Sequence, residues 1–168
     1  MMMRYLFLLL TLALLCCSNT QNRFDVPSGF YFKISDGANN SYNSKTALFK
    51  RCYSNGAKSY EISLNDAEIR MIYNLYKEIH FYNFPKEFEI EWNDTDTVTI
   101  VTPRFDTSME ICEDDSCNKV ILNLIDLENP ISNKEKAQQY KRLYDKIWQI
   151  IMNKEEYTDI PDSDCIYL

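Results

Sequence analysis

The chain has 168 residues and a formal net charge of −7 at neutral pH, with 25 acidic residues against 18 basic ones. Nucleic-acid-binding proteins, and proteins that adhere to membranes through charge, carry clusters of basic residues, so this balance disfavours both classes. Only three glycines and one histidine occur, which excludes a glycine-rich phosphate loop and leaves little material for acid–base catalysis. The length suits one domain.

The N-terminus begins with an apolar run of the kind found in export signals. Arg4 is followed by a largely apolar stretch from Tyr5 to Leu15, which ends at Cys16 and Cys17. The run is as long as the core of a signal peptide and too short to span a bilayer, which needs about 20 residues. We therefore predict that residues 1–16 are a signal peptide.

The end of the run places a leucine three residues before a cysteine. Leu14 precedes Cys17 by three positions, and the small Cys16 lies directly before it. This resembles the lipobox of bacterial lipoproteins, and the resemblance implies lipidation of Cys17 by palmitate-type acyl chains. The protein would then be anchored in the cell envelope, on the periplasmic or surface-facing side of the outer membrane. Each buried methylene contributes about 0.8 kcal/mol, so two or three chains anchor stably. The alternative is a secretory signal cleaved near Ser18, without lipid.

Residues 17–28 are polar and contain Pro27, which predicts a flexible tether between the lipid and the domain. Residues 29–168 are predicted to form that domain. Its first half starts with strand-like residues Phe30–Ile34, followed by a predicted loop from Asp36 to Ser44.

A β-hairpin is predicted next. The β-prone runs Thr46–Tyr53 and Ala57–Leu64 flank Asn55-Gly56. Asn-Gly between such runs is a strong hairpin signal, because both turn positions need a positive φ.

A helix is predicted directly after this hairpin. Asn65 and Glu68 form a capping-box pattern, and Leu64 and Ile69 can form a hydrophobic staple around it. The helix must end before Pro85. Its apolar residues recur at helical spacing: Ile69, Ile72, Tyr73, Tyr76 and Ile79.

The second half begins with strand-like segments. Glu87–Trp92 and Thr95–Thr102 alternate in polarity, and Ser108–Cys112 and Cys117–Leu124 are the arms of a second hairpin. The segment Val120–Leu127 also fits a helix.

An amphipathic helix is predicted near the C-terminus, with Ser132 and Glu135 as its capping box. An acidic tail begins at Tyr157. The predicted core stripe of the helix consists of Ala137, Tyr140, Tyr144, Ile147 and Ile151, with Leu143 and Trp148 beside it. Strands and helices in this order predict an α+β fold, an antiparallel sheet with two main amphipathic helices packed on one face.

Four cysteines follow Cys17, and an even number in an exported chain predicts disulfides. A two-residue turn at Asp114-Asp115 would make Cys112 and Cys117 directly facing residues, about 4.5–5.5 Å apart at Cα, which a disulfide accepts. That leaves Cys52 to pair with Cys165 and hold the tail. The alternatives are free buried thiols or a zinc site, although the spacing typical of zinc ligands is missing.

One stretch resembles a known group of proteins. The segment ISLNDAEIRMIYNLYKEIHFYNFP, the β-prone DTVTIVTP and the final helix are similar to small uncharacterised lipoprotein domains of Gram-negative bacteria. The resemblance implies no catalytic residues.

Few residues are candidates for chemistry. His80 borders the apolar stripe of the first helix, where a packing role is expected. Asp94 and Asp96, and the group Asp159, Asp162 and Asp164, lack the pattern of a calcium loop. Tyr31, Tyr42 and Tyr53 would line a recognition face or, as we favour, fill the core.

These observations predict a non-enzymatic binding or interaction module, anchored in the membrane by its acyl chains, with a protein or glycan partner in the envelope. No cofactor, metal or nucleic acid is expected. The alternatives are an envelope hydrolase that uses carboxylates with His80, or a structural spacer lipoprotein.

Overall fold

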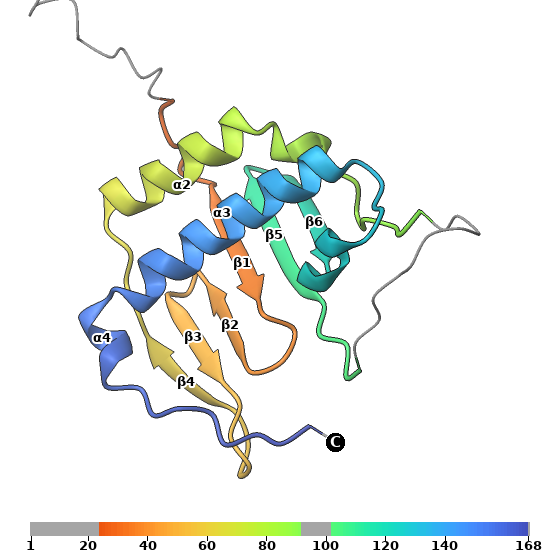
Figure 1. The fold of residues 1–168 in the computed structure, drawn as a ribbon. Helices are drawn as coiled ribbons and strands as arrows, with labels where there is room; N and C mark the ends of the chain where they lie inside the picture. Colours follow the sequence, from red (N-terminus) through yellow and green to blue (C-terminus); the bar gives the residue numbers. More distant parts are fainter. Residues whose placement is uncertain (1–23, 92–101, 168) are drawn as a thin grey trace, which may run out of the picture.

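The protein is built on a six-stranded antiparallel sheet of order β4-β3-β2-β1-β5-β6 (Figure 1). The computed structural model describes residues 24–91 and 102–167. The strands are β1 (Tyr31–Ser35), β2 (Asn40–Asn43), β3 (Leu48–Arg51), β4 (Lys58–Glu61), β5 (Thr107–Glu113) and β6 (Ser116–Leu122). The first four strands form a meander, and β5 returns to pair with β1 on its free side.

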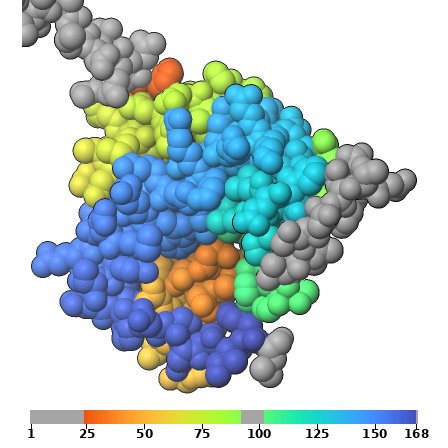
Figure 2. Space-filling view, viewed as in Figure 1, coloured from red at the N-terminus to blue at the C-terminus, as the bar shows by residue number. Residues whose placement is uncertain are grey.

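Two long helices cover one face of this sheet, as Figures 1 and 2 show. They are α2 (Asp66–Glu78) and α3 (Lys134–Met152), and the shorter helical elements are η1 (Phe81–Asn83), η2 (Leu124–Glu128) and α4 (Glu155–Thr158). The predicted α+β class is confirmed. Within the described ranges, no helix is long and apolar enough to cross a membrane.

The core lies between the helices and the sheet. From the sheet, Phe32, Ile34, Phe49 and Ile111 are almost completely buried, and Ile72, Leu143 and Ile147 are their counterparts on the helices. Every residue predicted for the core stripe of α3 is buried. The spacing of about 3.6 residues per turn therefore identified the packed face correctly.

Helix α2 begins as the sequence predicts. The Asn65 side chain accepts a hydrogen bond from the Glu68 backbone N–H at 3.0 Å, and the Glu68 carboxylate accepts one from the Asn65 N–H at 2.8 Å. Both bonds satisfy backbone donors that the first turn leaves free. Helix α3 differs, because it begins at Lys134 behind Asn133, which has a φ of 53° and no side-chain cap. The predicted Ser132–Glu135 capping box is wrong.

The predicted loop Asp36–Ser44 contains strand β2. One carboxylate oxygen of Asp36 accepts hydrogen bonds from three backbone N–H groups, those of Ala38, Asn39 and Asn40, at 2.8–2.9 Å. This side chain closes a compact turn, so the chain is already extended again at Asn40. Tyr42 is the only buried residue of β2, which is why the sequence of this strand is mostly polar.

The first predicted hairpin forms between β3 and β4, but its turn is different. Of the two turn residues Asn55 and Gly56, only Gly56 has a positive φ, of 112°. The expected two-residue turn needs a positive φ at both, so it does not form here. Residues 87–91 form no strand either, since Glu87 and Ile90 make only isolated bridges, to Ile121 and Ile131. Trp92 and almost all of the predicted strand Thr95–Thr102 lie outside the described residues.

The second hairpin matches its prediction. Strands β5 and β6 pair through a two-residue turn, with Glu113 opposite Ser116 and Cys112 opposite Cys117. The helix alternative for Val120–Leu127 is wrong for its first half, because β6 continues to Leu122 before η2 begins.

Candidate functional site

The histidine lies just beyond helix α2, which ends at Glu78, and not on the helix beside its apolar stripe as predicted. His80 has a φ of 52° and is exposed, and its Nδ1 lies 3.2 Å from the hydroxyl of Tyr82. Among the residues that the structure describes, no carboxylate shares a hydrogen bond with His80. The hydrolase alternative needs such a pair, so the described residues give it no support.

The tail carboxylates contact the protein itself. Asp164 accepts hydrogen bonds from the backbone N–H and hydroxyl of Ser54, at 2.7 and 2.8 Å, and these bonds lower the pKa of Asp164. Asp162 lies 3.9 Å from Arg51. Across the described ranges, no three acidic, histidine or cysteine side chains are grouped as metal ligands would be. Asp94 and Asp96 lie outside those ranges.

The three tyrosines considered for recognition do not share a surface. Tyr42 is 2% exposed, its hydroxyl donates to the Ile62 carbonyl at 2.9 Å, and burial raises its pKa to about 12. The hydroxyl of Tyr53, which is also buried, donates to the Pro161 carbonyl at 2.8 Å. Both are core residues with bonded hydroxyls, and only Tyr31 remains partly exposed.

Both predicted disulfides are present. Cys112 and Cys117 are bonded across the β5–β6 hairpin with their Cα atoms 4.1 Å apart. Cys52 and Cys165 are bonded with a Cα separation of 6.0 Å, although 113 positions separate them in sequence. The chain therefore closes one short and one very long covalent loop.

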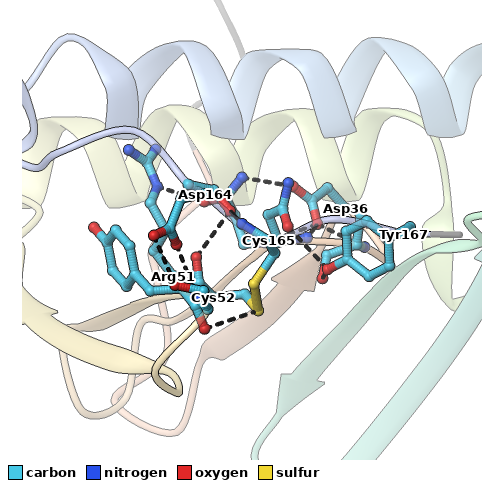
Figure 3. Close-up of a disulfide and its surroundings, with 12 residues drawn as sticks. Asp36, Arg51, Cys52, Asp164, Cys165 and Tyr167 are labelled. Carbon is cyan, nitrogen blue, oxygen red and sulfur yellow. Dashed lines mark hydrogen bonds between the residues drawn. A yellow bond between two sulfur atoms is a disulfide. The ribbon is translucent and has the colours of Figure 1, made fainter.

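The long-range disulfide belongs to a C-terminal strap, which we define as residues 160–167. Figure 3 shows the Cys52–Cys165 bond at its centre and Tyr167 beside Asp36. The hydroxyl of Ser163 donates to the Cys52 carbonyl at 2.8 Å, and that of Tyr167 donates to the Ala38 carbonyl at 2.7 Å. The strap thus fastens the C-terminus to the turns at one end of the sheet.

A buried arginine completes this attachment. Arg51 is 5% exposed, and its guanidinium donates to Asn40 Oδ1, the Pro161 carbonyl and the Tyr157 hydroxyl at 2.6–2.8 Å. Its guanidinium carbon also lies 5.2 Å from the ring centres of Phe49 and Tyr157. A buried charge needs such partners, so we assign Arg51 a structural role.

A second polar cluster joins α2 to the β5–β6 hairpin. The Glu113 carboxylate accepts from the hydroxyls of Tyr73 and Tyr76, at 2.6 and 3.1 Å, and from the Lys77 ammonium at 3.2 Å. Partial burial would raise the pKa of Glu113, but these hydrogen bonds outweigh burial and lower it. The carboxylate is therefore ionised at neutral pH and is unsuited to be a general acid.

The sheet face opposite α2 and α3, which we name the open face, is not covered by any helix in the described part of the chain. Successive side chains of a strand alternate between the two faces, so Tyr31, Lys33 and Ser35 of β1 point away from the helices. Two cross-strand rows form the centre of this face. One row consists of Lys119, Glu110, Lys33, Asn43 and Leu48, and the other of Ile121, Ser108, Ser35, Ser41 and Lys50.

Short side chains leave a shallow basin of about 410 Å³ on the open face. Serines from three adjacent strands, Ser41, Ser35 and Ser108, lie side by side in its lining. The hydroxyls of Ser41 and Ser108 make no hydrogen bond with another described residue. They are therefore available to a bound molecule.

Lysines surround this basin. Lys33 pairs with Glu110 at 2.6 Å, and Lys45 lies 4.9 Å from the centre of the Tyr31 ring. Lys45, Lys50 and Lys119 are exposed and form no ion pair with any other residue of known position. Among the described residues, the acids on the open face are Glu110, Glu61, which lies opposite Leu48, and Glu87, which bridges Ile121 at the β6 edge. The four lysines Lys33, Lys45, Lys50 and Lys119 therefore leave this face slightly cationic in an acidic protein.

A larger groove, of about 1390 Å³, runs between the outer sides of α2 and α3. Its charges are mixed, and Arg142 pairs with Glu78 at 2.6 Å. The chain itself enters here, because Phe24 lines the groove and its backbone N–H donates to Asn74 Oδ1 at 3.2 Å. The first described residue therefore lies in this groove.

Comparison with known proteins identifies no relative, since no family model, curated protein or solved structure matches the chain. The candidate site therefore depends on this geometry alone.

Proposed function

We propose that the chain is a lipid-anchored cell-envelope protein, acylated at Cys17, that binds a partner through its open face and catalyses no reaction. The observation that carries the proposal is the open face itself. A six-stranded sheet with one face that no described helix covers presents a broad surface. Its basin has serine hydroxyls and lysines that lack a partner among the described residues. Binding sites are typically concave and carry a few placed polar groups.

The entry point of the chain supports an orientation for this module. Cys17 precedes Phe24 by seven residues, which span at most about 25 Å when fully extended. Phe24 lies on the helix side of the domain, in the groove beside α2. An anchored protein would therefore hold its helices toward the membrane and present the open face away from it.

The proposal is tested by filling the basin without changing the charge. Ser41→Tyr places a large ring at the centre of the open face, where strand residues tolerate tyrosine well. The matched control is Gln138→Tyr, at an exposed position of α3. We expect Ser41→Tyr to abolish sedimentation of the purified domain with envelope fractions of the producing cells, and Gln138→Tyr to leave it unchanged. Equal sedimentation of the two variants would reject the open face as the binding surface.

A further inference from the structure

We infer that the ligand of the open face is an anionic polysaccharide, a glycan polymer that carries phosphate, sulfate or carboxylate groups. The inference rests on the proposed function and specifies the ligand of the same surface. It is based on the charge, the hydroxyl groups and the dimensions of that surface.

The charge distribution selects an anion. Among the described residues, four lysines and three glutamates face this side, and of the lysines only Lys33 is paired with an acid. The chain as a whole has a net charge of −7, so a polyanion is repelled by most of the molecule. Such a field directs an anionic ligand to this cationic face.

The hydroxyl groups suit a sugar. Ser41 and Ser108 each offer one donor and two acceptor positions. Asn43 adds the NH2 group of its amide, whose oxygen already accepts from the Lys45 N–H at 3.0 Å. Ser35 accepts from the Gly37 N–H at 3.1 Å and keeps its own donor. Sugar hydroxyls need partners of this mixed kind, whereas a small inorganic anion would need donors alone.

The dimensions suit a polymer. Lys119 lies on edge strand β6 and Lys50 on β3, four strand positions away in the sheet order. Neighbouring strands are about 4.8 Å apart, so these lysines are roughly 20 Å apart. That distance fits a chain with repeated charges better than a single anionic group.

An acidic protein partner is the competing ligand, and the composition of the face disfavours it. The centres of protein–protein interfaces are enriched in aromatic and apolar residues. Here serines lie at the centre, and the apolar Leu48 and Ile121 lie toward the ends of the two rows.

Binding of dextran sulfate, with neutral dextran as its uncharged counterpart, tests the inference on the purified disulfide-bonded domain. The test variant is Lys50→Gln/Lys119→Gln, which removes two lysines that have no ion pair with a described residue. The control Lys134→Gln/Lys146→Gln changes the net charge equally on α3. We expect dextran sulfate to bind and dextran not to bind. The Kd should rise about tenfold or more in the test variant and less than about twofold in the control.

Three results would overturn the inference. They are equal binding of dextran and dextran sulfate, equal weakening in the two lysine variants, and equally tight binding of poly-glutamate, which would indicate an acidic protein ligand. Ser41→Tyr separates this inference from the proposed function. If Ser41→Tyr abolishes envelope binding while the lysine variant retains it, the open face stands and the anionic class is rejected.

Discussion

Glu113 is the residue whose environment makes the clearest prediction about stability. Its carboxylate holds α2 against the β5–β6 hairpin through hydrogen bonds from Tyr73, Tyr76 and Lys77. Because its pKa is lowered in the folded protein, Glu113 contributes stability above its unfolded pKa of about 4.3. That contribution is lost as the pH falls through the folded pKa.

The substitution Glu113→Gln should therefore cost about 1.5–3 kcal/mol of unfolding free energy at pH 7, the range for hydrogen bonds to a charged group. Urea unfolding at several pH values measures this difference, which should narrow progressively below about pH 4. A difference that stays constant between pH 7 and pH 3 would contradict the role given to the ionised carboxylate.

The two disulfides should contribute differently to stability, because one holds the C-terminal strap and the other closes the β5–β6 hairpin. Removal of the Cys52–Cys165 bond frees a strap that closes a loop of 113 positions, whereas the Cys112–Cys117 bond closes only 5. Loop-closure entropy predicts losses of about 5 kcal/mol for Cys52→Ala/Cys165→Ala and about 2 kcal/mol for Cys112→Ala/Cys117→Ala. Urea denaturation of the two double variants measures both losses, and equal losses would show that the strap does not stabilise the fold as described.

The elements that the sequence predicts correctly are those with local signals. The capping box at Asn65 and the facing cysteines of the β5–β6 hairpin involve residues a few positions apart, whose geometry is set by the backbone itself. Strand β2 was missed because the Asp36 side chain closes a compact turn, so the chain returns to the sheet sooner than a loop from Asp36 to Ser44 would allow. The start of α3 was misplaced because Asn133 adopts a left-handed conformation that the capping-box pattern does not indicate.

The candidate site was not predictable from the sequence. Lys33 and Lys119 meet on one face only through the pairing of β1 with β5, which are more than 70 residues apart in the chain. Ser41 and Asn43 were assigned to a loop, so the sequence did not indicate on which face of the sheet their side chains lie. In β1 and β6, polar residues alternate with core residues, and this alternation indicates which residues of each strand face away from the core. It does not indicate which residues of the two strands lie near each other, because register between distant strands is set by tertiary packing.

For the whole molecule, the proposed lipid anchor would determine which surface meets a partner. Intact mass spectrometry of the protein isolated from its host should show a chain that begins at Cys17 and carries acyl chains. The variant Cys17→Ser should lose the added mass and leave the membrane fraction. An unacylated chain that begins beyond Cys17 would exclude the anchor and the orientation derived from it.

The most direct test of the central claim, that the open face is the binding surface, is lysine footprinting of the wild-type protein with and without envelope fractions. Acylation of exposed lysines, quantified by peptide mass spectrometry, reports each side chain separately. We predict that Lys33, Lys50 and Lys119 become protected when the envelope material is present, while Lys134, Lys141 and Lys146 on α3 react as before. Protection of the α3 lysines, with the open-face lysines unchanged, would contradict the account.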